Sequence, residues 1–237
     1  MEKENVIMGD LNQLKYLKDN AHLVKGPILE IGSKDYGNNP NYRVMFPDKS
    51  YVGIDLENGK GVDAVIDLSI NYEKIISKLK IDKFNTVICF SVLEHCKDLF
   101  KVCSNIQKLL NSKGHLFISV PFCWEYHRFP EDYWRFTPEG IKILFPDFEF
   151  IDNHTMISTS KIGEIKSPDN EFYKLDMAPR VGIQKKRYSL FAGIVIKIFK
   201  YFPFLKPIFD YTFLMPPVAV QMVGIKKGSS PSLLKDE

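Results

Sequence analysis

The chain has 237 residues, of which 45% are hydrophobic and 26% charged. This length and composition suit one folded domain that carries an insertion, and they exclude a disordered or collagen-like chain. The formal net charge of +3 is too small to favour nucleic acid as a partner.

The four cysteines form no C-x-x-C pair and no Cys/His cluster with the spacing of zinc ligands. We therefore expect reduced thiols, no metal site and a cytoplasmic protein. The N-terminal stretch mixes acidic and basic residues and lacks the long apolar core of a signal peptide, so we do not expect export.

From Gly26 onward, short apolar runs alternate with amphipathic stretches, a pattern that predicts an α/β fold with a parallel sheet. The first five predicted strands are continuous runs of Val, Ile and Phe, as expected where both faces of a sheet are covered. In chain order we predict a helix at Leu11–Lys18, strands at Pro27–Ile31, Tyr51–Asp55 and Ala64–Asp67, a helix at Tyr72–Lys80, a strand at Thr86–Phe90, a helix at Leu99–Leu110, a strand at Leu116–Val120, a helix at Pro138–Leu144, and strands at Phe148–Ile151 and Val218–Ile225. Asp98 is the expected N-cap of the third helix, and Gly114 its stop signal.

The turn after the first strand favours a ligand without phosphates. In an open parallel sheet the ligand crevice lies beyond the carboxyl ends of the strands, so the turn that follows Glu30 faces the ligand. A dinucleotide fingerprint requires a second glycine where this chain has Lys34. A nicotinamide-dependent dehydrogenase is therefore disfavoured.

The next three strands also end in polar residues. Asp55 can accept hydrogen bonds from two ribose hydroxyls, and Asp67 lies within reach of an adenine amino group. Ser91 follows the fourth strand at the same edge of the sheet. Together these residues predict a nucleoside site, although Asp67 before Leu68-Ser69 could instead cap a turn.

Four motifs, LEIGSKDYGN, YVGIDLENGKGVDAVIDL, FNTVICFSVLEH and GHLFISVPF, occur in this order and resemble those of class I S-adenosylmethionine-dependent methyltransferases of the type 11 branch. The resemblance covers about residues 26–144. It implies a Rossmann-like, seven-stranded, mostly parallel sheet with helices on both faces and an antiparallel last strand. It further implies S-adenosylmethionine as cofactor and S-adenosylhomocysteine as product. Carried over residue by residue, the resemblance assigns cofactor binding to Glu30, Gly32, Ser33, Asp55, Leu56, Asp67, Leu68, Ser91 and Val92.

The first motif departs from the family pattern, because Lys34 and Tyr36 stand in two glycine positions. This form of the motif resembles a subgroup found beside glycosyltransferases in surface-glycan pathways. The stretch Pro130–Thr137 resembles the P-x-D-Y-W-R-F-T stretch of the same subgroup.

The segment after the fifth strand holds both tryptophans of the chain and predicts a substrate wall. Aromatic faces with polar handles match the alternating apolar and hydroxyl faces of a sugar. The predicted substrate-binding residues are Trp124, Tyr126, Tyr133, Trp134 and Arg135. The alternative is that these aromatics pack the loop and that Asp132 and Arg135 form a structural ion pair.

Methyl transfer from a sulfonium requires mainly alignment and exclusion of water, but a hydroxyl acceptor must also lose its proton. The predicted catalytic residues are His127, as the base, and Asp132. Asp132 or Glu125 could be the base itself or could orient His127. His95, which follows Glu94, could line the site or have a packing role.

Residues 157–217 are too long for an ordinary connection and are predicted to be an insertion or lid. Within them, 185–209 is basic and apolar, with no uncharged run long enough to span a bilayer. As a helix this segment suits peripheral contact with an anionic membrane surface, a second subunit in a homodimer, or a lid on its own domain. Residues 228–237 are expected to form a flexible tail.

The sequence therefore predicts a methyltransferase that O-methylates a sugar hydroxyl on a small-molecule or glycan substrate, in glycan or polysaccharide biosynthesis. A lipid or quinone-like acceptor is one alternative. A catalytically inactive, methyltransferase-like binding protein is another, because two glycines of the cofactor turn are replaced.

Overall fold

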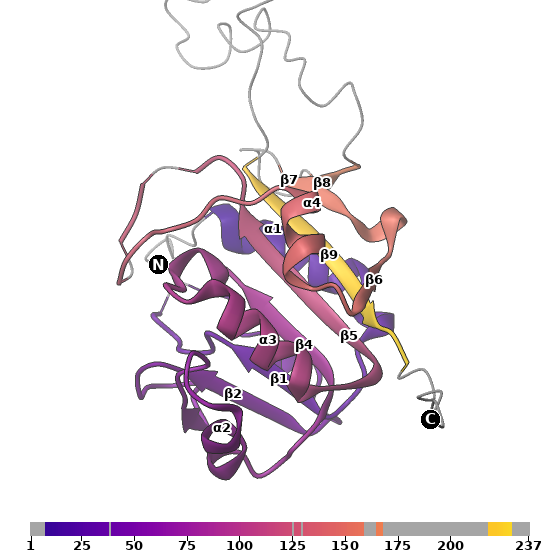
Figure 1. Ribbon diagram of the computed structural model, residues 1–237. Helices are drawn as coiled ribbons and strands as arrows, with labels where there is room; N and C mark the ends of the chain where they lie inside the picture. The colour runs from indigo at the N-terminus through magenta and orange to yellow at the C-terminus, as the bar shows by residue number, and fades with distance from the viewer. Residues whose placement is uncertain are drawn as a thin grey trace, which may run out of the picture. The chain divides into compact units, whose positions relative to one another are not determined.

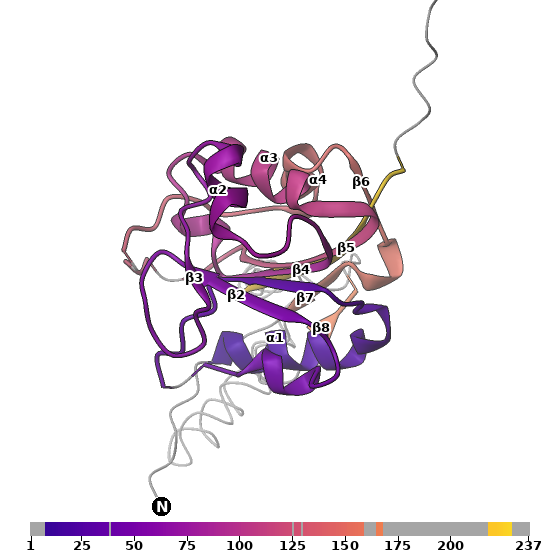
Figure 2. The ribbon, with the colours of Figure 1, turned by 90° about the horizontal axis from the view of Figure 1, so that it is seen from below.

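The structure is a computed structural model, and it describes residues 8–37, 39–124, 126–128, 130–158, 165–167 and 218–228. Its centre is a mostly parallel sheet. Helix α1 lies on one face of this sheet, and helices α2, α3 and α4 lie on the other (Figure 2). The helices are α1 (Met8–Asp19), α2 (Tyr72–Lys78), α3 (Leu99–Leu109) and α4 (Pro138–Leu144). The 3-10 helices are η1 (Ala21–Leu23), η2 (Tyr42–Met45), η3 (Leu93–His95) and η4 (Asp152–His154).

The strands run in the order β3-β2-β1-β4-β5-β9-β7-β8, and β6 also pairs with β9 (Figure 1). Strands β1 to β5 pair in parallel, whereas β9 runs antiparallel to β5. The strands are β1 (Ile28–Ile31), β2 (Tyr51–Asp55), β3 (Ala64–Val65), β4 (Phe84–Phe90), β5 (Leu110–Pro121), β6 (Phe148–Phe150), β7 (Met156–Ser158), β8 (Ile165–Lys166) and β9 (Ala219–Lys226). The predicted α/β class and the antiparallel last strand are confirmed.

The sheet has nine strands in the described residues, and the expected number of seven is thus too low. Strands β6 and β7 pair with successive parts of β9, at Phe148↔Lys226 and at Ile157↔Val220. They therefore form one interrupted row, and η4 lies at the interruption. If β6 and β7 are counted as one strand, they and strands β1 to β5 and β9 make up the seven expected strands. Strand β8 is then an additional short strand at the edge of the sheet.

The helices and strands differ from the prediction mainly at their ends. Asp98 caps α3 as expected, because its side chain accepts a hydrogen bond from the backbone N–H of Lys101. The stop signal was misplaced: α3 ends at Leu109, and Gly114 lies within β5. The third strand ends at Val65, before Asp67.

One face of the sheet buries a core cluster together with α1. Tyr16 and Leu17 of α1 pack in this cluster with Ile28, Ile88 and Phe117 of the sheet. Tyr42 and Phe46, from the connection between β1 and β2, complete the same cluster. In the described residues, the connection between β1 and β2 contains one helical element, η2. The helix that covers this face of the sheet is therefore mainly α1, which precedes β1 in the chain.

None of the helices in the described part of the chain has the length and hydropathy that crossing a bilayer requires. The predicted segment at 185–209 and most of the predicted insertion at 157–217 lie outside the described residues, as does most of the tail. At the start of the insertion, Ile157 and Ser158 belong to β7, and Ile165 and Lys166 form β8.

Candidate active site

A cavity of about 470 Å³ lies beyond the carboxyl ends of β1, β4 and β5. Its lining comes from the ends of these strands, from α1 and from the loop that follows β5. Among the residues that line it are Gln13, Glu30, Gly32, Lys34, Tyr36, Ser91, Glu94, His95, Trp124, His127 and Arg128. The cavity is therefore at the edge of the sheet where the sequence predicts the cofactor.

Two tight turns form the floor of this cavity. Gly32 has a φ of +77°, and a Cβ at this position would lie 2.6 Å from Cγ2 of Val92. A residue with a side chain is therefore excluded there by both conformation and space. Ser91, at the end of β4, has a φ of +50°, and its hydroxyl accepts a hydrogen bond of 2.7 Å from Nε2 of Gln13. This bond ties α1 to the floor of the cavity.

The Glu30 carboxyl lies in β1 between the main cavity and a second cavity of about 260 Å³. It accepts a hydrogen bond of 2.7 Å from the hydroxyl of Tyr51. Burial raises the pKa of Glu30 to about 7, although the Tyr51 bond opposes this shift. Protonation of this carboxyl is therefore favoured relative to that of an exposed glutamate.

Glu30→Gln should change how stability depends on pH. Because the folded pKa is above the ordinary value of 4.5, the folded protein binds the extra proton between these values. The free energy of unfolding should then fall as pH rises from about 4.5 through about 7. Urea titrations at pH 5, 6, 7 and 8 should show a shallower fall in Glu30→Gln, which can still accept the Tyr51 bond. Glu149→Gln, at an exposed position of β6, is the control, and equal slopes in wild type and Glu30→Gln would contradict the assignment.

Asp55 ends β2 and is joined to the turn after β1. Its carboxylate accepts hydrogen bonds of 3.2 Å from the backbone N–H groups of Lys34 and Glu57. The Lys34 ammonium pairs with Glu57 and lies 4.9 Å from the centre of the Tyr36 ring. Lys34 and Tyr36, which stand in two glycine positions of the family motif, thus line the cavity and contact each other.

Some of the residues predicted to bind cofactor line this cavity, and others, including Asp55, do not. Glu30, Gly32 and Ser91 line it, whereas Ser33 lines the second cavity. Leu56 is exposed and Leu68 is buried, and Val92 packs near Gly32. Asp67 is exposed, and its carboxylate accepts a bond of 2.7 Å from the Ser69 N–H, the local turn contact considered as its alternative role.

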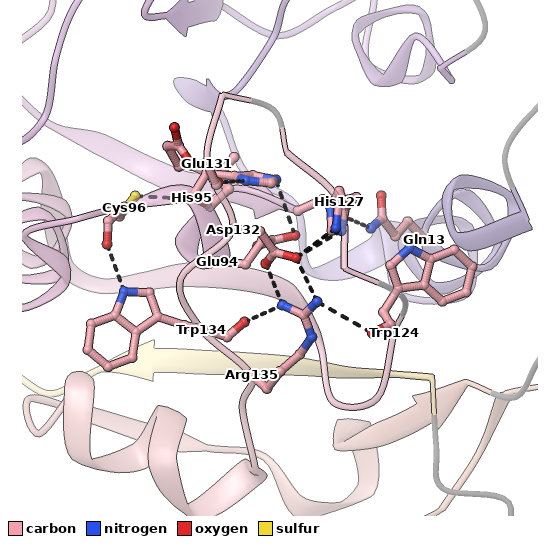
Figure 3. A network of polar contacts seen from close by, with 12 residues as sticks. Gln13, Glu94, His95, Cys96, Trp124, His127, Glu131, Asp132, Trp134 and Arg135 are labelled. Carbon is pink, nitrogen blue, oxygen red and sulfur yellow. Dashed lines mark hydrogen bonds and ion pairs between the residues drawn. The ribbon is translucent and has the colours of Figure 1, made fainter.

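A buried aspartate holds His127 and Arg135 together (Figure 3). The Asp132 side chain is only 1% exposed and accepts hydrogen bonds from both terminal nitrogens of Arg135. It also accepts a bond of 2.9 Å from the His127 N–H, and His127 Nδ1 lies 3.3 Å from the same carboxylate. The Arg135 hydrogen bonds hold the pKa of Asp132 well below its usual range. The ion pair between Asp132 and Arg135, which the sequence analysis gave as the alternative role of these residues, is therefore present. The ionised Asp132 carboxylate also faces the imidazole ring of His127.

Two hydrogen bonds attach the loop after β5 to η3 and to the residue that follows it. The Tyr133 N–H donates to the Glu94 carbonyl and the Trp134 indole N–H to the Cys96 carbonyl, both at 2.8 Å. Trp134 thus anchors the loop, whereas Trp124 lines the cavity. Tyr126 and Tyr133 are exposed to solvent, Arg135 is bonded to Asp132, and Glu125 lies outside the described residues.

These hydrogen bonds also bring together three side chains that the sequence analysis did not predict as a group. Ligand atoms of Glu94, His95 and His127 all lie within 4.8 Å of one another. Burial raises the pKa of the Glu94 carboxyl to about 8, and burial also lowers the pKa of His95. The signal in the sequence was a Glu-His pair directly after one strand and a histidine in the loop after the next strand.

Residues 13–154 match the model of a family described as a methyltransferase domain. No curated protein is similar enough in sequence to match the chain.

Many solved structures share the fold. An S-adenosylmethionine-dependent methyltransferase from Archaeoglobus fulgidus is 14% identical with a TM-score of 0.52, over 91% of this chain and 94% of that one. A possible histamine N-methyltransferase from Thermotoga maritima is also 14% identical with a TM-score of 0.52, over 93% and 92%. The 1,6-didemethyltoxoflavin-N1-methyltransferase of Burkholderia thailandensis, with bound S-adenosylhomocysteine, is 12% identical with a TM-score of 0.51, over 93% and 80%.

The family match covers more than half of the chain, and the strand order and the position of the cavity agree with it. The chain therefore belongs to the methyltransferase-domain family and is an S-adenosylmethionine-dependent methyltransferase of the class I fold.

Proposed function

We propose that this methyltransferase O-methylates a hydroxyl of a sugar, on a lipid-linked or nucleotide-linked intermediate of glycan or polysaccharide biosynthesis. The observation that carries the proposal is the position of His127. It lies in one cavity with Glu30, Gly32 and Ser91, and Asp132 fixes its ring from behind. Trp124 lines the same cavity and supplies the aromatic face that suits a sugar ring.

The residues present fit the cofactor. Gly32 lines the cavity with no side chain and with a φ of +77°, so a ligand can approach its backbone. In the proposal, Glu30 and Gly32, with Ser33 beside them, border the methionyl part of the cofactor, and Ser91 with Val92 forms the far wall of its site. Asp55 with Leu56 holds the ribose, and Asp67 with Leu68 holds the adenine. When bound, S-adenosylmethionine supplies a methyl group on a positively charged sulfur, which is already a good leaving group.

His127 would accept the proton of the acceptor hydroxyl. Because Nδ1 faces the ionised Asp132 carboxylate, the proton of the neutral ring lies on Nδ1 and Nε2 is the acceptor atom. Asp132 is then the orienting partner, since a carboxylate with a strongly lowered pKa is a poor base at neutral pH. His95 contacts His127 edge to face, with ring centres 5.1 Å apart, and limits how far the His127 ring can turn.

Calorimetric titration tests the cofactor site. We expect adenosylmethionine and adenosylhomocysteine to bind in the micromolar range, about −8 kcal/mol, and NAD to show no binding. Asp55→Ala removes the acceptor of two ribose hydrogen bonds, so we expect binding about 100-fold weaker, from roughly 3 kcal/mol. Asp82→Ala, at an exposed position before β4, is the matched control. Unchanged affinity in Asp55→Ala would overturn the assignment.

Labelled methyl transfer tests the acceptor class. With sugar nucleotides and lipid-linked saccharides as acceptors, we expect label on a sugar hydroxyl, and Trp124→Leu should raise KM for the acceptor while cofactor affinity stays unchanged. Labelling of quinones or lipids in place of every saccharide tested would overturn the sugar assignment and leave the cofactor site standing.

A further inference from the structure

The cluster of Glu94, His95 and His127 has the composition of a metal site. Glu94 and His95 come from η3, and His127 comes from the loop after β5. All three line the cavity, and their ligand atoms lie within 4.8 Å of one another. Ligands bound at about 2.1 Å to one ion lie about 3 to 4 Å apart, so a small rotation of these side chains would complete the site.

In both histidines Nδ1 faces an oxygen acceptor, which leaves Nε2 as the nitrogen that would bind an ion. Nδ1 of His95 lies 2.5 Å from the carbonyl oxygen of Glu131, and a carbonyl can only accept, so the proton lies on Nδ1. Nε2 then carries a lone pair, and it lies 3.9 Å from Oε1 of Glu94. His127 directs Nδ1 toward Asp132 in the same way. A carbonyl or carboxylate behind each ring is the usual support of histidines that bind metal.

The third ligand is a buried carboxylate. The Glu94 side chain is 2% exposed, and among the described residues its Oε2 atom has no hydrogen-bond partner. Burial of an unpartnered carboxyl oxygen is costly. A bound cation would displace the proton of this carboxyl and supply the missing partner. This atom is therefore a second observation, independent of the histidines, that indicates a ligand.

We propose that Glu94, His95 and His127 bind one divalent transition-metal ion, with Zn²⁺ as the best match. Two imidazole nitrogens and one carboxylate are the donor set of catalytic zinc and non-haem iron sites, whereas Mg²⁺ and Ca²⁺ prefer oxygen ligands. Three protein ligands leave a coordination position open toward the cavity. Asp132 and the Glu131 carbonyl are the supporting contacts.

The chemical role of the ion rests on the proposed function. The ion lowers the pKa of an acceptor hydroxyl beside it, and Nε2 of His127 is then a ligand and no longer the base. The hydroxyl proton leaves to solvent, and the oxygen forms the bond to the methyl carbon. The carbon–sulfur bond breaks, and its electron pair stays on sulfur.

Metal binding is tested directly on the full chain. After removal of metal with EDTA, titration with Zn²⁺ should show one ion per chain, with Mg²⁺ binding far more weakly. Glu94→Gln and His95→Gln should each weaken Zn²⁺ binding at least about 10- to 100-fold. His22→Gln, at an exposed histidine outside the cavity, should bind as wild type does. Absence of Zn²⁺ binding, or equal binding in all the variants, would overturn the site.

Co²⁺ provides a readout that needs no variant. Wild type should give the visible absorption bands of Co²⁺ with nitrogen and oxygen ligands, and Zn²⁺ should displace them; absence of these bands would also overturn the site. Adenosylmethionine titration of the EDTA-treated protein separates the two proposals, because cofactor binding should persist without metal. Full methyl transfer in that protein would overturn the role of the ion and leave His127 as the base.

Discussion

Gly53→Ala should lower the free energy of unfolding by about 3 kcal/mol. Gly53 is buried in the middle of β2. A Cβ there would lie 2.4 Å from the carbonyl oxygen of Gly61 and 2.6 Å from the hydroxyl of Ser33. A backbone carbonyl cannot rotate away as a side chain can, so the turn after β1 and the loop after β2 would both have to move.

Urea unfolding followed by circular dichroism measures this loss. The control is Gly140→Ala in α4, where the nearest atom would be 3.4 Å away, and a helical alanine should raise stability by about 0.5 kcal/mol. Because Asp55 lies two residues after Gly53, adenosylmethionine should also bind more weakly to Gly53→Ala. A loss below about 1 kcal/mol would show that the contacts between β2 and its neighbouring loops are looser than the structure indicates.

The parallel half of the sheet could be predicted because each of its strands carries a strong local signal. The runs at Ile28–Ile31 and Tyr51–Asp55 are apolar, short and bounded by turn residues, and helices of clear amphipathic period follow later in the chain. The order of these strands and the antiparallel last strand came from the resemblance, since local patterns carry no information on pairing.

Strands β7 and β8 could not be predicted in the same way. They are three and two residues long, and no continuous apolar run bounded by turn residues marks them in the sequence. Their pairing with β9 and with each other depends on contacts far apart in sequence. The start of β5 was missed for another reason: Leu110 follows α3 directly, so no turn residue separates helix from strand.

The two halves of the site differ in how well the sequence predicts them. The ends of parallel strands meet at one edge, so the sequence alone predicts that Glu30, Asp55 and Ser91 lie at the same edge of the sheet. The grouping of Glu94 and His95 with His127 depends instead on the path of a loop. That path is fixed by backbone bonds such as the one from Tyr133 to Glu94, which no residue pattern encodes.

Asp132→Ala should lower the free energy of unfolding by about 2 to 4 kcal/mol. The substitution removes the acceptor of two Arg135 hydrogen bonds and of the His127 N–H. It leaves a guanidinium whose side chain is only 30% exposed without its carboxylate. Asp132→Asn keeps a neutral acceptor at the same place and should lose roughly half as much.

The loss should depend on pH in a defined direction. Because the folded pKa of Asp132 is well below its ordinary value of 3.8, its contribution is complete above that value and is lost as pH falls toward the folded pKa. Urea titrations of wild type and Asp132→Ala should therefore differ most near pH 7 and converge in acid. Asp98→Ala, which removes the cap of α3, is the matched control and should cost about 1 kcal/mol. A smaller loss in Asp132→Ala than in Asp98→Ala would contradict the buried network.

The same variants separate the structural role of Asp132 from its effect on His127. Asp132 lies outside the lining of the cavity. Its hydrogen-bond partners in the described residues, His127 and Arg135, are not assigned to the cofactor, so adenosylmethionine affinity should remain within about twofold of wild type in Asp132→Asn. Methyl transfer should nevertheless fall by about 10- to 100-fold, because the His127 ring loses the carboxylate that fixes its tautomer and orientation. A fall in kcat with unchanged cofactor affinity indicates positioning of His127, whereas a parallel loss of both would indicate that the loop after β5 supports the whole cavity.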